Sequence, residues 1–163
     1  MKKSGMGSHE SSRMLNDEWL TPPEIIYELG PFDLDPCSPI NRPWETAIDH
    51  YSKIDNGLSK RWGGFVWLNP PYGKMAYRWL EKLSQHNNGI ALLFARTETK
   101  MFQKLVWGQA TSILFIYGRL KFYDVNGIES KVNSGAPSVL IAYGKEADYR
   151  LGTCHIEGKY IKL

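Results

Sequence analysis

Apolar runs and helically spaced apolar residues alternate along the central part of the chain. Four largely apolar runs, of the kind that form strands buried on both faces, are residues 65–68, 89–95, 112–117 and 138–143. Two segments between them, residues 75–86 and 100–109, carry apolar side chains at helical spacing. This alternation predicts an α/β protein with a mostly parallel sheet. The last run follows a polar, glycine-containing loop at 124–134 and is expected to pair antiparallel with the run before it.

The N-terminal part of the chain predicts a tail, a helix and a short strand. Residues 1–15 are rich in Ser, Gly and Lys and show no periodicity, which indicates a flexible tail. Thr21 is a preferred N-cap residue, and Glu24 three positions later completes a capping box. A helix is therefore expected up to Gly30-Pro31, followed by a strand over residues 32–35.

The connection after this strand is too short for the helical crossover that usually joins parallel strands. Residues 39–55 are expected to form a loop or a single helical turn and then a short strand over residues 50–54. Asp55-Asn56-Gly57-Leu58 is a strong turn signal. Residues after Gly144 are expected to form a further β-hairpin or tail. The predicted organisation is a tail (1–15), a main domain (16–145) and a C-terminal β extension (146–163).

Composition narrows the class of protein without deciding its function. The 163 residues suit one domain, and the net charge of +3 is compatible with nucleic acid without requiring it. Cys37 and Cys154 belong to no Cys-x-x-Cys pair, so we expect neither zinc nor a disulfide framework, and a reducing cytoplasm fits. No apolar run reaches membrane-spanning length and no secretory signal is present, so no membrane association is expected. The sequence is silent on oligomeric state.

The most informative stretch is Asn69-Pro70-Pro71-Tyr72, directly after the apolar run 65–68. Each proline lacks a backbone N–H and fixes φ at about −65°, and Pro71 drives Pro70 into an extended conformation. The result is a stiff turn with an amide side chain at one end and an aromatic ring at the other. Ligands bind at the carboxyl ends of strands in open α/β sheets. The turn therefore predicts a binding or catalytic site.

Polar residues also follow other predicted strands. Asp35 and Pro36 end the first strand, where a carboxylate is well placed for the amine or ribose of a nucleotide-like cofactor. The small Cys37 and Ser38 would let such a ligand approach the backbone, although a Gly-x-Gly-x-x-Gly fingerprint is absent. Arg96 follows the run 89–95 and is difficult to assign to packing, because a guanidinium rarely goes unpaired.

A succession of short motifs extends from residue 17 to residue 143. They are Asp-x-Trp-x-Thr-Pro at 17–22, Asp-x-Asp-Pro at 33–36, Asp-Asn-Gly-Leu at 55–58, Asn-Pro-Pro-Tyr-Gly at 69–73, Ala-Arg-Thr at 95–97 and Gly-Arg-Leu-Lys-Phe at 118–122. This succession resembles the compact phage-type DNA N6-adenine methyltransferases. The resemblance implies a Rossmann-like class I methyltransferase sheet that is mostly parallel, with an antiparallel C-terminal hairpin and a truncated first crossover.

The resemblance also implies a reaction: methyl transfer from S-adenosylmethionine to the exocyclic amine of adenine in DNA, without metal. In that family, the side-chain oxygen matching Asn69 and the carbonyl matching Pro70 accept the hydrogens of the amine. The ring matching Tyr72 stacks on the target base, which has been turned out of the duplex. The catalytic residues implied are thus Asn69, Pro70, Pro71 and Tyr72.

Further roles follow by position in the same motifs. The residues assigned to the cofactor pocket are Thr21, Pro22, Asp35, Pro36 and Asp55, with Trp19, Asp33 and Cys37 as secondary candidates. Asp55 is alternatively a simple turn former. Arg96 and Arg119 are candidates for contacts to the DNA backbone or the target base, and the alternative for Arg119 is a buried salt bridge.

Three other interpretations stay open at the level of sequence. The acceptor can be another planar amine, namely cytosine N4, RNA adenine or a protein glutamine. A nucleic-acid-binding module without activity can share the fold, although the intact Asn69–Tyr72 set argues against it. A nucleotide-binding protein or nuclease fits poorly, because the chain has no Walker-type glycine loop and no compact carboxylate or His cluster with metal spacing.

Overall fold

The computed structural model describes residues 18–163. The predicted tail and Asp17 of the first motif lie outside these residues. The strands are β1 (Leu34–Asp35), β2 (Asp49–His50), β3 (Val66–Leu68), β4 (Gly89–Phe94), β5 (Ser112–Ile116), β6 (Ser138–Tyr143) and β7 (Gly158–Lys162). The helices are α1 (Pro23–Leu29), α2 (Ala76–His86), the π-type helix η1 (Phe102–Trp107) and α3 (Lys145–Thr153).

All seven strands belong to one sheet with the order β2-β1-β3-β4-β6-β5-β7. β1 pairs parallel with β2 and β3, and β3 pairs parallel with β4. β6 lies between β4 and β5 and is antiparallel to both, and β7 is antiparallel to β5. Five strands, β2, β1, β3, β4 and β5, therefore run in one direction, and β6 and β7 run in the other. The predicted antiparallel pairing of β5 with β6 is confirmed.

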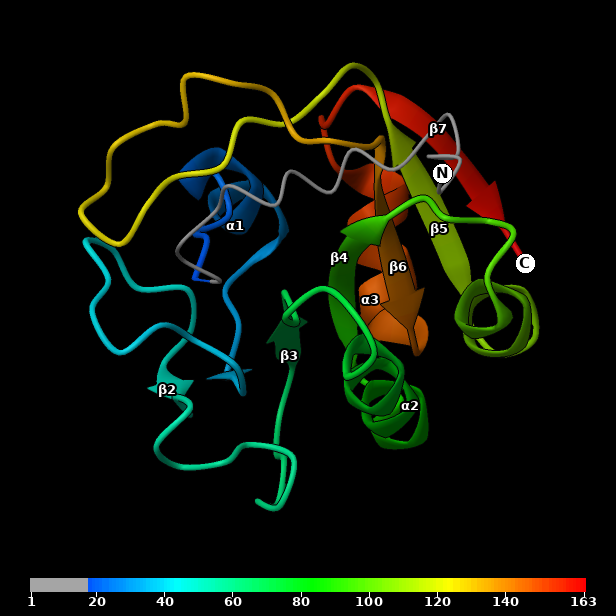
Figure 1. The fold of residues 1–163 in the computed structure, drawn as a ribbon. Helices are drawn as coiled ribbons and strands as arrows, with labels where there is room; N and C mark the ends of the chain where they lie inside the picture. The colour runs from blue at the N-terminus through cyan, green and yellow to red at the C-terminus, as the bar shows by residue number, and fades with distance from the viewer. Residues whose placement is uncertain (1–17) are drawn as a thin grey trace, which may run out of the picture.

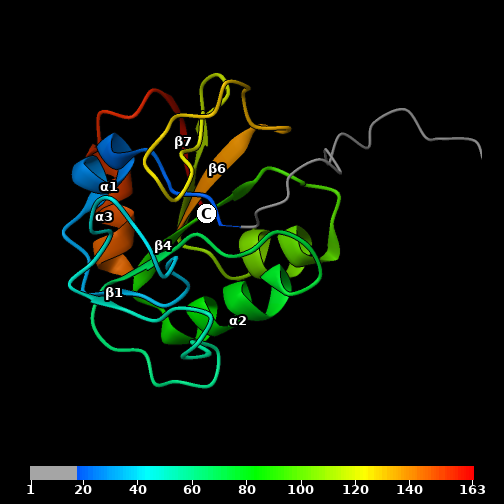
Figure 2. The ribbon, with the colours of Figure 1, turned by 60° about the vertical axis from the view of Figure 1, so that its left-hand side comes forward.

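Helices cover both faces of the sheet (Figures 1 and 2). On one face, α1 and α3 pack with alternate strand residues such as Trp67 and Leu92. On the other face, α2 and η1 pack with the intervening residues, such as Leu68 and Leu93. Because side chains of a strand alternate between faces, two covered faces require continuous apolar runs. This arrangement explains why the central strands read as unbroken apolar segments.

The first crossover is truncated, as expected. β1 and β2 pair parallel, yet residues 36–48 between them contain no helix. The second strand is shorter and earlier than predicted, covering Asp49–His50, because Lys53 to Ser59 already form turns. One of these turns is closed by Asp55, which accepts hydrogen bonds from the backbone and hydroxyl of Ser52.

The predicted capping box at Thr21 is wrong. Helix α1 begins at Pro23, its N-cap is Pro22, and no side chain caps it. Thr21 therefore lies one position too early to reach the first free amides of the helix. Its hydroxyl oxygen instead accepts a hydrogen bond from a side chain 48 positions away, Asn69. The end of the helix at Gly30 agrees with the prediction.

The predicted β-hairpin or tail after Gly144 is also wrong. Residues 145–153 form α3, whose Ala147 and Leu151 are fully buried against the sheet. Only then does the chain return as β7, which pairs with the outer side of β5. A helix fits this stretch because Ala147 and Leu151 are four positions apart and lie on one helical face.

Candidate active site

The carboxyl ends of β1, β3, β4 and β5 lie along one edge of the sheet, and the predicted catalytic turn leaves the end of β3 there (Figure 1). Asn69 is half-buried, Pro70 is buried, and Pro71 and Tyr72 are exposed. The same edge receives two segments that are distant in sequence. Residues 18–21 supply partners for the side chain of Asn69, and Cys37 supplies one for its backbone.

The carboxamide of Asn69 is held in one orientation. Its Nδ2 donates to the backbone oxygen of Trp19 and to Oγ1 of Thr21, each at 3.3 Å. A carbonyl oxygen can only accept, so the amide nitrogen and not the oxygen must face Trp19. Oδ1 therefore points the other way, and no hydrogen bond within residues 18–163 ends on it. The turn presents an acceptor that is oriented and available.

The ring of Tyr72 is presented at the other end of the turn. It stacks on Phe94, with ring centroids 4.2 Å apart and an interplanar angle of 4°. Tyr72 remains 39% exposed, and Phe94 covers one face of its ring, which leaves the opposite face as the candidate surface for a further planar group. Desolvation raises the pKa of the Tyr72 phenol, so the hydroxyl is neutral at physiological pH.

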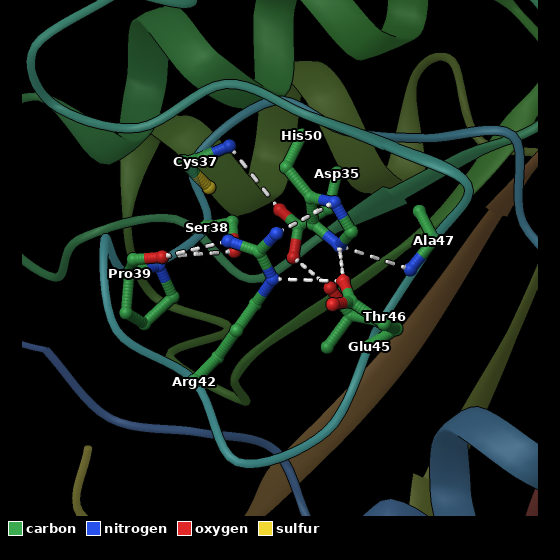
Figure 3. Close-up of polar contacts among 9 residues, drawn as sticks. All are labelled: Asp35, Cys37, Ser38, Pro39, Arg42, Glu45, Thr46, Ala47 and His50. Carbon is green, nitrogen blue, oxygen red and sulfur yellow. Dashed lines mark hydrogen bonds and ion pairs between the residues drawn. The ribbon is translucent and has the colours of Figure 1, made fainter.

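Asp35 is a buried carboxylate at the end of β1, and Figure 3 shows the side chains that surround it. Oδ2 accepts a hydrogen bond of 2.5 Å from the Thr46 hydroxyl, and Oδ1 accepts one of 3.2 Å from the backbone N–H of Cys37. Burial raises the pKa of Asp35 to about 6, although both hydrogen bonds and the more distant Arg42 oppose the rise. No ion pair within residues 18–163 neutralises this carboxylate.

The chain was compared with known proteins. The family described as DNA N-6-adenine-methyltransferase (Dam) matches residues 8–152. The chain belongs to this family. It is also 25% identical, over 150 residues covering 82% of each chain, to the protein named DNA N-6-adenine-methyltransferase of Haemophilus phage HP1 (strain HP1c1). No solved structure matches it. Membership confirms the resemblance drawn from the motifs and the predicted reaction class, N6-adenine methylation of DNA by an enzyme.

The other residues assigned to the cofactor pocket fall into two groups. Pro36 and Cys37 adjoin the catalytic turn, since the Cys37 thiol donates to the backbone oxygen of Asn69 at 3.1 Å. Pro22 is buried beside Thr21, and Trp19 contributes its backbone oxygen to the Asn69 amide while its ring packs against the core of the enzyme. Trp19 and Cys37 thus lie at the catalytic turn, and the assignment of the group to the cofactor pocket stays a prediction.

Asp33 and Asp55 are not brought into this cluster. Oδ2 of Asp33 accepts a 2.6 Å hydrogen bond from the N–H of Phe65, before β3 begins and thus at the opposite end of that strand from Asn69. Asp55 is exposed, and its carboxylate closes the turn with Ser52, which also lowers its pKa. Its neighbour Gly57 does approach the site, because a Cβ there would lie 2.0 Å from the carbonyl oxygen of Pro36.

The two arginines assigned to the DNA have no carboxylate partner within residues 18–163. Arg96 is half-buried after β4, and no side-chain hydrogen bond from it is present in the described part of the chain. Arg119 is exposed and donates to the backbone oxygen of Ser134 at 3.2 Å. The alternative of a buried salt bridge for Arg119 is therefore wrong.

Sequence reasoning missed the network that supports Asp35 (Figure 3). Arg42 donates to Nδ1 of His50 at 3.2 Å and to Glu45 at 2.9 Å, and Thr46 holds Asp35 itself. Burial and the Arg42 charge lower the pKa of His50, which keeps its ring neutral and able to accept. These residues lie in an irregular loop, where no periodicity marks them.

Within residues 18–163, no group of three or more His, Cys, Asp and Glu side chains is arranged to hold a metal ion. No helix in that part of the chain has the length and apolar character needed to cross a membrane.

Proposed function

We propose that the chain transfers the methyl group of S-adenosylmethionine to N6 of an adenine that has been turned out of the DNA duplex. The observation that carries this proposal is the fixed orientation of the Asn69 carboxamide, with Nδ2 occupied and Oδ1 available. The family gives the reaction class, and this orientation supports the Asn69 turn as the site of the reaction.

The exocyclic amine of adenine is a poor nucleophile because its lone pair is delocalised into the ring. Two acceptors can bind its two hydrogens: Oδ1 of Asn69 and the backbone oxygen of Pro70, neither of which receives a hydrogen bond within residues 18–163. Hydrogen bonds from a tetrahedral nitrogen to these oxygens would localise the lone pair for attack. Because the turn is stiff, the acceptors require little reorganisation during the reaction.

Tyr72 supplies a stacking surface for the extruded base. Phe94 covers one face of its ring, and the exposed remainder offers the other to a purine. Stacking on an aromatic ring compensates for part of the energy lost when the base leaves the duplex. The base would then lie with its amine toward Asn69 and Pro70.

The residues near Asp35 fit the cofactor. S-adenosylmethionine supplies an electrophilic methyl group and carries an ammonium group. A buried carboxylate without a cationic partner is destabilised, and an ammonium group would relieve this. Asp35 is such a carboxylate, and Pro36 and Cys37 lie between it and the catalytic turn. We assign Asp35, Pro36 and Cys37 to the cofactor side of the site.

Arg96 and Arg119 are assigned to the DNA side. Both follow strands that end at the edge carrying the catalytic turn, and neither is neutralised by a carboxylate within the described residues. A free guanidinium at this edge suits a phosphate contact, whose contribution to affinity falls as salt rises.

The proposal is tested by incubating the purified protein with labelled S-adenosylmethionine and DNA, RNA or protein, and then digesting the product. N6-methyladenine from DNA is the expected product. N4-methylcytosine, methylated RNA or methylated glutamine would transfer the same chemistry to a different acceptor and contradict the assignment of the substrate.

Asn69→Ala is expected to lower the rate of methyl transfer by roughly a hundredfold or more, because an oriented acceptor is lost. Cofactor affinity should change little. Asn88→Ala is the matched control, since its amide bonds to Gly64 near the start of β3, at the opposite edge of the sheet. A normal rate of methyl transfer in Asn69→Ala would show that Asn69 has no catalytic role.

A further inference from the structure

A groove of about 730 Å³ opens beside the carboxyl end of β5. The residues that matter for its chemistry are Tyr117, Gly118, Arg119, Pro137, Glu157 and Lys159. They come from the segment after β5, the residue before β6 and the start of β7. None of the proposed catalytic residues lines it.

The groove lies near the proposed base-binding position. Pro137, on its wall, accepts a 2.8 Å hydrogen bond from the backbone N–H of Ala95. Ala95 directly follows Phe94, the ring that stacks on Tyr72. A residue on the wall of the groove is therefore hydrogen-bonded to the chain neighbour of one of the stacked rings. A chain of nucleotides that places one base on Tyr72 has its neighbouring nucleotides within reach of the groove.

The side chains of the groove combine an exposed aromatic ring with cations. Tyr117 is 79% exposed, although its backbone is fixed by a 2.9 Å hydrogen bond to the carbonyl of Glu157. Arg119 and Lys159 form no ion pair within residues 18–163. Glu157 is the single acidic side chain on the wall, so the charge balance of the lining is positive. Stacking platforms flanked by cations are the usual means of holding single-stranded nucleic acid.

A simpler explanation exists for part of this pattern. β7 is an edge strand, and lysines on edge strands prevent pairing with other chains. That explanation accounts for Lys159. It does not account for an exposed tyrosine and an arginine that line the same groove at the carboxyl end of β5.

We propose that this groove binds the DNA strand that carries the target adenine, on one side of the extruded base. Tyr117 stacks on a neighbouring base, and Arg119 and Lys159 contact its phosphates. This inference rests on the proposed function, because it assumes that the extruded base lies against Tyr72.

The test is a fluorescence-anisotropy titration of the full chain with labelled single-stranded and duplex oligonucleotides, with S-adenosylhomocysteine present. Tyr117→Ala is expected to bind DNA roughly tenfold more weakly, and Tyr117→Phe to bind like the wild type, because stacking needs only the ring. The double variant Arg119→Ala/Lys159→Ala is expected to reduce the slope of log affinity against log salt by about 1.4 to 1.8, the value for two phosphates.

Matched controls lie away from the groove. Tyr149→Ala removes a tyrosine that is 68% exposed on α3. Lys145→Ala removes a lysine just after β6, which ends at the edge of the sheet opposite the groove. Neither should alter DNA affinity or its salt dependence. Melting temperatures of all variants should match the wild type, because the substituted side chains are exposed.

The outcomes separate the two proposals. If the groove variants keep the wild-type DNA affinity and salt slope while the wild-type enzyme is active, the groove proposal alone is contradicted. A wild-type protein that methylates no adenine in DNA would overturn the proposed function and the groove with it.

Discussion

The contact that organises the site joins two residues 48 positions apart, Thr21 and Asn69. A solvent-exposed asparagine would sample both orientations of its amide. In this protein, the carbonyl of Trp19 and the hydroxyl of Thr21 both accept from Nδ2 of Asn69, which leaves the amide a single orientation. Thr21 is therefore a positioning residue as much as a candidate cofactor contact.

Thr21→Val is expected to lower kcat roughly tenfold, because it removes one of the two acceptors that orient the Asn69 amide. Cofactor affinity should stay within about twofold of the wild type, since one neutral hydrogen bond is lost from a neighbouring group. Thr21→Ser, which keeps the hydroxyl, should restore kcat. The measurement is steady-state kinetics together with calorimetric binding of S-adenosylhomocysteine. An equal loss in affinity and in kcat would show that Thr21 acts mainly as a cofactor contact.

The raised pKa of Asp35 predicts how the free energy of unfolding depends on pH. Its pKa is raised to about 6 in the folded protein, from 3.8. Between these values the folded state binds more protons than the unfolded state, so the free energy of unfolding falls as pH rises, by up to about 3 kcal/mol in total. Asp35→Asn should flatten this decline in urea unfolding between pH 4 and pH 7, and weaken cofactor binding.

Asp55→Asn is the control for Asp35, because it alters an exposed carboxylate and should leave the decline between pH 4 and pH 7 in place. An unchanged pH dependence in Asp35→Asn would mean that Asp35 is not the group that titrates. Unchanged cofactor affinity in Asp35→Asn would show that Asp35 does not belong to the cofactor pocket.

At the scale of elements, residues 18–21 form a bridge between two parts of the site. Leu20 and Tyr123 exchange backbone hydrogen bonds of 2.8 and 3.0 Å. Tyr123 belongs to the segment 118–134, whose two arms are joined by backbone bonds such as Ser130 to Phe122. The N-terminal segment thus contacts both this arm and the catalytic turn.

The turn at residues 55–58 is packed against the end of β1 as a unit. Gly57→Ala would place a Cβ 2.0 Å from the backbone oxygen of Pro36, so one of the two segments must move. We expect a loss of roughly 2 kcal/mol in the free energy of unfolding, with weaker cofactor binding. Gly63→Ala is the matched control, because nothing lies within 4 Å of a Cβ at that position. Equal melting temperatures for the two variants would contradict the close packing at Pro36.

At the scale of the whole molecule, the last 19 residues complete one layer (residues 145–163). α3 and β7 cover part of the face formed by Leu114, Leu140 and Ala142. The predicted boundary at residue 145 assigns them to a C-terminal extension outside the main domain. Ala147 and Leu151 of α3 are nevertheless buried against the sheet of that domain.

A chain that ends at Gly144 is expected to lose cooperative unfolding or to aggregate, because it exposes apolar surface and the backbone of β5. Circular dichroism and size-exclusion chromatography provide the measurement, with Tyr149→Ala as a control that leaves the covered face intact. A truncated chain that melts cooperatively at the wild-type temperature would establish residues 16–145 as the domain.

Most strands and the α2 helix could be predicted because their signals are local. The runs 89–95, 112–117 and 138–143 became β4, β5 and β6 with ends within one residue of those expected. The errors arose where a distant partner decided the outcome. Thr21 bonds to Asn69 instead of capping a helix, and the segment after Gly144 folds as a helix because the sheet offers it an apolar face.

The sequence by itself determined the order of the elements, the stiffness of the Asn69–Tyr72 turn and the family, because periodicity, proline geometry and motif order are properties of neighbouring residues. The tertiary structure alone decided which side of the Asn69 amide faces outward, that Asp35 is buried with no ion-pair partner among residues 18–163, and that Tyr117 and Lys159 share a groove. These features depend on contacts between segments distant in the chain, whose spatial proximity is set by the open sheet and its two helical layers.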